Sequence, residues 1–199
     1  MSTSQPTQDT DSAAPAAASD NATSAATATS SKAVAPSSRP QPLQGAELFS
    51  AIESLTTKIL SASPVYSHLL SSLSLQSASP GQVTYIWPQL PAHCLNSHHT
   101  LHGAVSATLI DFLGGPVIAS TSSNPLEAKR GVSTDISAQY LREAKEGERV
   151  RIVGRAKKVG KRLAWVGVEI WAGGKEGGPE GGEGGERLCV EGSHTKFIA

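Results

Sequence analysis

Cysteine is scarce in this sequence, and neither sign of charge is in excess. Two cysteines, Cys94 and Cys189, are too few for the disulfide framework of a small secreted domain. Lys and Arg together number 17, as do Asp and Glu, and a formal net charge of zero argues against the basic surface that nucleic-acid binding requires. No run approaches the roughly 18 to 20 consecutive apolar residues of a membrane-spanning helix. We therefore expect a soluble protein with no nucleic-acid partner and no membrane span.

Large apolar side chains are almost absent from residues 1–42, which consist mostly of Ser, Thr, Ala and Pro. Burial cannot offset an ordering entropy of roughly 1 to 2 kcal/mol per residue in such a stretch, so we interpret it as a disordered tail. The tail also lacks the basic start and apolar run of a secretory signal. A mitochondrial presequence is the alternative, although such segments are rich in Arg and poor in acidic residues. We expect a cytoplasmic protein, with the mitochondrion as the alternative.

The remaining residues, 43–199, are enough for one domain with a single core. The stretch GGKEGGPEGGEGGE at 173–186 has the composition of a flexible loop. We expect it to be an insertion within the domain rather than the end of one.

Hydrophobic periodicity predicts the order of the first elements. Apolar residues recur every three or four positions over 45–60, which predicts an amphipathic helix whose extension Pro64 limits. Short alternating runs on each side of Pro80 and Gly81 predict a two-stranded hairpin. The segment 100–115 is apolar nearly all round and is too long for a strand, so it predicts a buried helix.

The second half of the chain has the alternation of strands. Four are expected, over 132–141, 149–159, 163–171 and 188–198. Gly160 and Lys161 predict a tight turn between the second and third of them. The whole order indicates an α+β domain in which the buried helix fills the inner face of an antiparallel sheet.

Asp111 interrupts the buried helix and lies too far from its start to be a cap. A carboxylate there is costly unless it is hydrogen-bonded, paired or facing a cavity. It is therefore either a structural residue with satisfied hydrogen bonds or a base that lines a pocket. Asn96, His102 and Gly103 precede or begin the same helix, where free backbone N–H groups can polarise a carbonyl oxygen.

Two further clusters carry polar chemistry. The first contains four histidines and a cysteine with a spacing that fits no standard zinc pattern, so we expect a polar loop and no metal: His93, Cys94, His98, His99 and His102. The second, residues 149–162, holds seven basic residues and no acidic ones. Four of them would share one face of a strand, either in solvent or as a docking surface for a compact polyanion such as nucleotide phosphates: Arg149, Arg151, Arg155 and Lys157.

Four segments together resemble a known family: TLHGAVSATLID at 100–111, GVSTDISAQYLREAKEGERV at 131–150, KKVGKRLAWVGVEIW at 157–171 and EGSHTKFI at 191–198. In one consistent order they resemble the hotdog-fold thioesterase superfamily, and within it the phenylacetyl-CoA thioesterase-like and small acyl-coenzyme A thioesterase branch. The resemblance implies a hotdog fold, a long central helix wrapped by a curved antiparallel sheet. It implies hydrolysis of acyl-CoA thioesters to free acid and CoA, at sites shared between the subunits of a homodimer or homotetramer.

The same resemblance implies roles for individual residues. Asn96 helps to position substrate and water, the Gly103 N–H faces the thioester carbonyl, Asp111 is the general base or nucleophile, and Ser133 assists the water and the carboxylate. Substrate contacts are implied for His102, Tyr140, Leu141, Lys145, Lys158, Val159, Gly160, Lys161, Arg162 and Leu163. No metal and no cofactor are expected beyond the coenzyme A of the substrate.

The sequence departs from the family pattern around the central helix. Ala104 replaces the usual second glycine after Gly103, and Glu143 stands where relatives often have Pro. Because proline removes a helix hydrogen bond, we expect the helix to kink or stop at Pro116. If these changes displace the carbonyl-polarising donors, the alternative function is a hotdog protein that binds acyl-CoA or a partner without catalysis.

Overall fold

The computed structural model describes residues 40–174 and 185–198. Residues 1–39, 175–184 and Ala199 lie outside it. The disordered tail over residues 1–42 therefore stays a prediction for nearly its whole length, as does most of the flexible insertion at 173–186.

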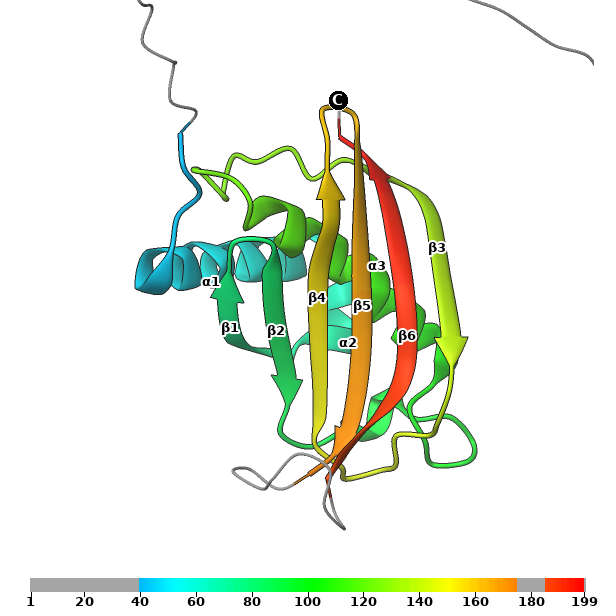
Figure 1. The fold of residues 1–199 in the computed structure, drawn as a ribbon. Coiled ribbons are helices and arrows are strands. Elements are labelled where there is room, and N and C mark those ends of the chain that lie inside the picture. The colour runs from blue at the N-terminus through cyan, green and yellow to red at the C-terminus, as the bar shows by residue number, and fades with distance from the viewer. Residues whose placement is uncertain (1–39, 175–184, 199) are drawn as a thin grey trace, which may run out of the picture. The chain divides into compact units, whose positions relative to one another are not determined.

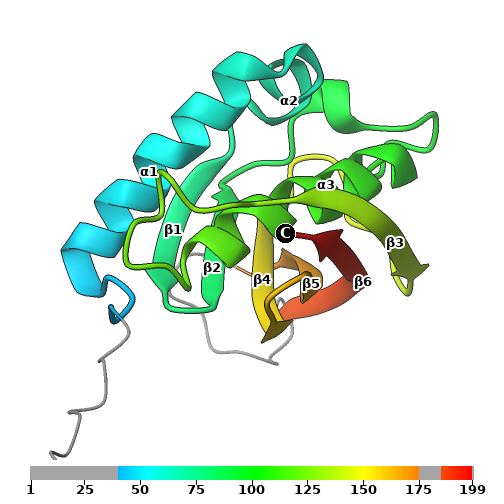
Figure 2. The ribbon, with the colours of Figure 1, turned by 90° about the horizontal axis from the view of Figure 1, so that it is seen from above.

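The described residues form a six-stranded antiparallel sheet in the order β1-β2-β4-β5-β6-β3. Its strands are β1 (Ser74–Ser79), β2 (Gln82–Trp87), β3 (Val132–Tyr140), β4 (Val150–Val159), β5 (Leu163–Gly173) and β6 (Glu186–Phe197). The helices are α1 (Gly45–Ala62), α2 (Pro64–Leu70) and α3 (Gly103–Ala119), with a short 3-10 turn η1 (Ala92–Cys94) before α3. Figure 1 views the open face of the sheet with α3 behind it, and Figure 2 shows all three α-helices on the other face.

A buried apolar stripe and a following proline account for the extent of the first helix. Leu48, Ile52 and Leu55 are fully buried along one stripe of α1. The helix ends at Ala62, and Pro64 begins α2, a position where its missing N–H costs nothing. The expected limit at Pro64 is confirmed, but the short helix that follows was not foreseen from the sequence.

The central helix α3 is apolar nearly all round because it is enclosed by the sheet and the other helices. Leu109, Ile110 and Leu113 are completely buried. The expectation that α3 stops at Pro116 is wrong, since the helix continues to Ala119. The packing of this buried last turn outweighs the hydrogen bond that proline removes.

The end of α3 is also tied down by hydrogen bonds. The Ser120 N–H donates to the Pro116 carbonyl at 2.9 Å, and the Ser120 hydroxyl donates to the Val117 carbonyl at 2.7 Å. The same hydroxyl accepts the Gly81 N–H at 3.0 Å, which links α3 to the turn between β1 and β2. These bonds hold the proline-containing turn in helical form.

Glycines allow α3 to lie close against the sheet. A Cβ at Gly154 on β4 would lie 2.6 Å from a methyl of Val117 and 2.8 Å from a methyl of Leu113. On the helix side, a Cβ at Gly114 would collide with the His194 ring of β6. The missing side chains therefore set the distance between the helix and the sheet.

Two adjacent glycines of α3 give a matched test of this packing. Gly114→Ala should lower the free energy of unfolding by about 1 to 3 kcal/mol, the usual cost of overpacking, because the new methyl collides with His194 and lies 2.9 Å from Cδ of Lys196. Gly115→Ala meets its nearest neighbours only at 3.6 Å or beyond and should stabilise by up to about 1 kcal/mol through helix propensity. Urea unfolding of both variants measures the difference, and equal effects would contradict the close approach at Gly114.

Candidate active site

Asp111 holds its carboxylate between hydroxyl groups from two different parts of the fold. The Tyr66 hydroxyl of α2 donates to Oδ2 at 2.5 Å, and the Ser133 hydroxyl of β3 donates to Oδ1 at 3.0 Å. The Asp111 side chain remains 33% exposed. Both of its oxygens are oriented, and the group is still accessible to a small molecule.

A buried histidine and a buried lysine of β6 lie behind Ser133. Nε2 of His194 is 2.9 Å from the Ser133 hydroxyl oxygen, and the Lys196 ammonium donates to the same oxygen at 3.4 Å. Nδ1 of His194 is 3.2 Å from the Ile110 carbonyl, which can only accept a hydrogen bond, so this nitrogen carries a proton. In the neutral ring Nε2 is then an acceptor, and the Ser133 proton has two acceptors in reach, His194 and Asp111.

Burial sets the charge states of this network. It lowers the pKa of His194 below its ordinary value of 6.5, and the Lys196 charge lowers it further, while Asp111 acts in the opposite direction. Burial also lowers the pKa of Lys196 from 10.5, again opposed by Asp111. Burial and the bond to Asp111 raise the pKa of Tyr66, so its hydroxyl stays a donor at neutral pH.

A cavity of about 310 Å³ opens beside the Asp111 carboxylate, between the helices and the ends of β3 and β6. Its apolar wall comes from α1 and α3, and cationic side chains complete it: Lys58, Ile59, Ala62, Ser63, Tyr66, Asp111, Phe112, Gly115, Arg130, Gly131 and Lys196. The carboxylate therefore faces a space large enough for part of a small ligand.

A second group of expected site residues gathers at the start of α3. The Ala104 N–H donates to Nδ1 of His102, and no acceptor for the Gly103 N–H is found among residues 40–174 and 185–198. The Tyr140 hydroxyl donates to the Gly103 carbonyl at 3.0 Å. The structure thus leaves the Gly103 N–H as a free donor at a helix N-terminus.

Asn96 and Lys145 belong to the same group but are engaged in loop contacts. The Asn96 amide donates to the Thr100 hydroxyl at 3.0 Å, and its oxygen accepts the His98 N–H at 2.9 Å. The segment 141–145 pairs with this loop through an isolated bridge between Thr100 and Lys145. Within one chain, Asn96 shapes the turn before α3.

The two groups do not meet in one chain. Gly103 and Asp111 are eight residues apart on α3, which is roughly 12 Å along a helix. Ser133 and Tyr140 lie near opposite ends of β3, roughly 23 Å apart at the rise of a strand. The structure brings Asp111 to Ser133, and Gly103 to Tyr140, but not the first pair to the second.

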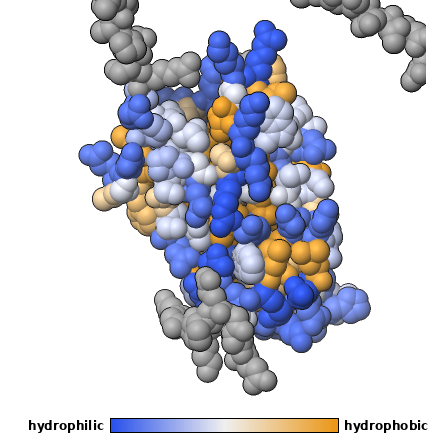
Figure 3. Space-filling model, viewed as in Figure 1, coloured by the Kyte–Doolittle hydropathy of each residue, from blue (hydrophilic) through white to orange (hydrophobic). Residues whose placement is uncertain are grey.

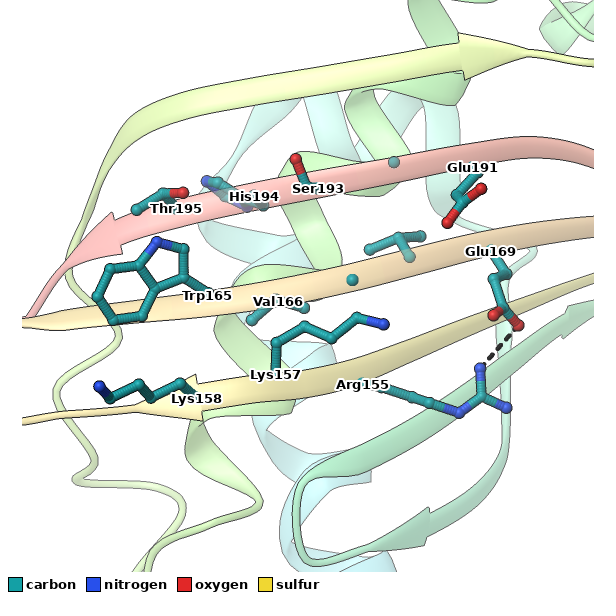
Figure 4. Close-up of a pocket in the computed structure, with 13 residues that line it drawn as sticks. Arg155, Lys157, Lys158, Trp165, Val166, Glu169, Glu191, Ser193, His194 and Thr195 are labelled. Carbon is teal, nitrogen blue, oxygen red and sulfur yellow. Dashed lines mark hydrogen bonds and ion pairs between the residues drawn. The ribbon is translucent and has the colours of Figure 1, made fainter. Parts of the chain in front are cut away.

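The basic residues of 149–162 lie partly on the open face of the sheet, and several are paired. The idea of four side chains projecting together into solvent is wrong for Arg149 and Arg151, which form ion pairs with Glu186 and are 17% and 22% exposed. Arg155 pairs with Glu169 at 2.7 Å, as Figure 4 shows.

The rest of this face carries both hydrophilic and hydrophobic side chains (Figure 3). A cavity of about 490 Å³ lies there, and its lining includes Lys157, Lys158 and Trp165 (Figure 4). Nζ of Lys158 lies 5.7 Å from the centre of a Trp165 ring, and the Lys157 chain lies over Gly167. The Lys158–Leu163 hairpin, expected to contact coenzyme A, is at this end of the sheet.

The part of the chain that the structure describes contains no group of three or more His, Cys, Asp or Glu placed to hold a metal ion. In the histidine cluster, Nδ1 of His99 instead contacts Glu146 at 2.9 Å. No helix among the described residues is long and apolar enough to cross a membrane.

Three residues of the Asp111 site were missed from the sequence. His194 and Lys196 share the inner face of β6 with Gly192, and this period-two pattern within EGSHTKFI was the available signal. Tyr66 offered no signal, because its contact with Asp111 spans 45 residues and depends on how α2 packs.

Comparison with known proteins bears on this arrangement. The family model of the thioesterase superfamily matches residues 98–178. Human acyl-coenzyme A thioesterase 13 is 31% identical over 133 residues, which cover 67% of this chain and 84% of that protein. The chain belongs to the thioesterase superfamily.

Solved structures agree on the fold of this thioesterase. Zebrafish thioesterase superfamily member 2 has a TM-score of 0.62 at 26% identity, with 76% of this chain and 98% of that chain covered. A hypothetical thioesterase protein from Streptococcus pneumoniae, solved with coenzyme A, has a TM-score of 0.56 at 21% identity, with 72% of this chain and 96% of that chain covered. The expected α+β hotdog fold and the expected thioesterase family are confirmed.

The lowered pKa of His194 makes stability depend on pH. As pH falls below 6.5, the His194 imidazole takes up a proton in the unfolded chain before it does so in the folded chain. The contribution of His194 to the free energy of unfolding is therefore full above pH 6.5 and is lost as pH falls from 6.5 to the lowered pKa. The free energy of unfolding should fall by up to about 1.4 kcal/mol per pH unit in that window. His194→Gln should flatten this slope, whereas His98→Gln, at an exposed histidine, should keep it. Urea unfolding between pH 5 and 8 measures the slopes, and a steep slope in the His194 variant would refute the assignment.

Proposed function

We propose that this thioesterase hydrolyses acyl-CoA thioesters to free acid and CoA, with Asp111 as the general base or nucleophile. The observation that carries the proposal is the Asp111 carboxylate, oriented by Tyr66 and Ser133 and open to a cavity. The name of the human relative, an acyl-coenzyme A thioesterase, supports this choice of substrate.

The chemistry follows from the groups in reach. As a base, Asp111 takes a proton from a water molecule whose oxygen attacks the thioester carbon. The negative charge that develops on the carbonyl oxygen is stabilised by the free Gly103 N–H of a neighbouring copy of the chain, since the two residues do not meet within one chain. The C–S bond then breaks, and the CoA thiolate leaves and is protonated. As a nucleophile, Asp111 instead forms an anhydride with the acyl group, which water hydrolyses to the same products.

Ser133 and Tyr66 have positioning roles in either route. By binding one carboxylate oxygen each, they fix the direction in which the remaining lone pairs of Asp111 point. His194 and Lys196 support Ser133 from behind. Asn96 joins the reaction only if it faces the Asp111 of another chain.

A second copy of the chain would complete the site. Strand β3 lies at the edge of the sheet, and its side chains Val132, Ile136 and Tyr140 are 65%, 39% and 59% exposed. An antiparallel neighbour along β3 would bring the Ser133 end of one copy opposite the Tyr140 end of the other. Asp111 of one chain would then face Gly103 of its neighbour, in a homodimer or a homotetramer built from it.

Cationic side chains are the candidates for the phosphates of coenzyme A. Lys145 lies beside the start of α3, and Lys158, Lys161 and Arg162 lie on the hairpin at the other end of β3. In an antiparallel pair these two regions approach one another. We expect no cofactor beyond the coenzyme A of the substrate, and a cytoplasmic location.

Asp111→Asn tests the catalytic role. The amide cannot accept the water proton or act as the nucleophile, so release of CoA from acyl-CoA substrates should fall by at least about 100-fold. The matched control is Glu53→Gln, at an exposed carboxylate of α1 that does not line the Asp111 cavity. Thiol release from short, aromatic and long acyl-CoA esters measures both variants.

Three outcomes of that assay are distinct. Loss of activity in the Asp111 variant alone supports the proposal. Unchanged turnover in that variant would refute the role of Asp111. Saturable acyl-CoA binding by the wild-type chain with no CoA release would favour the non-catalytic alternative.

The edge strand gives a separate prediction about assembly. Ile136→Lys should convert the dimer to monomer and abolish CoA release, because it places a charge in the middle of the β3 seam. Val65→Lys, at an apolar and more exposed position on α2, should change neither property. Sedimentation velocity combined with the thiol assay decides, and a dimeric, active Ile136 variant would overturn the shared site.

A further inference from the structure

The cavity beside Asp111 carries more positive charge than the reaction requires. Lys58, Arg130 and Lys196 line it, and Asp111 is the one acidic residue of its lining. Both Asp111 oxygens already accept hydrogen bonds from hydroxyl groups. Its single negative charge therefore cannot balance three cations.

Two of these cations have a buried nitrogen or side chain and form no ion pair among the described residues. Nη1 of Arg130 is buried and has no hydrogen-bond partner among the described residues. Lys196 is 8% exposed, and its ammonium reaches only the Ser133 hydroxyl, at 3.4 Å. Neither forms an ion pair with a carboxylate in residues 40–174 or 185–198. Buried charges of this kind are costly unless something of opposite sign binds them.

The shape of the cavity suggests what part of a ligand carries that charge. Its wall includes Ile59, Ala62 and Phe112, which suit a short run of methylene groups. Arg130 packs its stem over Gly115, where a Cβ would lie 3.6 Å from its Cδ. An acyl group whose thioester carbon is at Asp111 can extend along the apolar wall and end at the cations.

We propose that this cavity binds the carboxylate end of the acyl group, and that the preferred substrates are CoA thioesters of short dicarboxylic acids. The inference rests on the proposed function, because it takes Asp111 as the point of reaction. Arg130 and Lys196 bind the terminal carboxylate by charge-assisted hydrogen bonds. The phosphates of coenzyme A lie at the far end of the pantetheine arm from the thioester, outside a cavity of about 310 Å³.

Two unreactive analogues separate recognition from hydrolysis. The S-carboxybutyl and S-pentyl thioethers of CoA have equally long chains and no thioester, and they differ in the terminal carboxylate. Calorimetry on the full chain at pH 7 should show at least about tenfold tighter binding of the carboxybutyl analogue, the equivalent of one charge-assisted contact. Arg130→Met keeps the bulk of the stem and should abolish this preference while leaving S-pentyl binding unchanged. Lys129→Met, at the neighbouring exposed cation outside the cavity, should retain the preference.

Two results would overturn the inference. Equal binding of the two analogues by the wild-type chain would show that the cavity has no carboxylate subsite. An Arg130 variant that weakens both analogues equally would place the contact on the CoA phosphates. Circular dichroism of the Arg130 variant distinguishes that outcome from unfolding. Because neither analogue can be hydrolysed, a chain that prefers the carboxylate but releases no CoA from any thioester would retain the subsite and lose the proposed activity.

Discussion

Two hydroxyl hydrogen bonds allow a carboxylate to stand on a helix that is otherwise enclosed by apolar side chains. One hydroxyl comes from Tyr66, on a short helix that precedes the sheet, and the other from Ser133, on the last strand of the sheet order. Asp111 therefore joins three elements that are distant in sequence. The orientation of its carboxylate depends on how α2 and β3 pack against α3. A change that loosens this packing would therefore also change the orientation of the reactive group.

The main elements of the fold could be predicted from periodicity because each has a clear apolar pattern. The stripe of Leu48, Ile52 and Leu55 and the alternation along β5 correspond directly to burial. Pro116 misled because a local rule about proline competes with packing, and the buried last turn of α3 prevails. The short helix α2 was missed because seven residues carry too little pattern to distinguish a helix from a loop.

The candidate site was only half visible for a related reason. Asp111 is conspicuous as a lone charge within an apolar run, whereas Tyr66 and Arg130 have ordinary neighbours in sequence and acquire their roles by packing. The position of Asn96 and Gly103 at the start of the helix pointed to both, the resemblance added Ser133, and the structure divides the three between two places. The cations of the pocket beside Asp111 were also not predicted, because Lys196 points inward from a strand whose other residues are mixed in character.

The separation of Gly103 from Asp111 along one rigid helix has a consequence for mixtures of damaged chains. Under the proposed sharing of sites, each dimer contains two reaction centres. Each centre combines Asp111 of one subunit with Gly103 of the other. A chain defective at the start of α3 and a chain defective at its middle are each inactive alone. When they pair, both defects fall in the same centre and the other centre is intact, so two dead proteins complement one another.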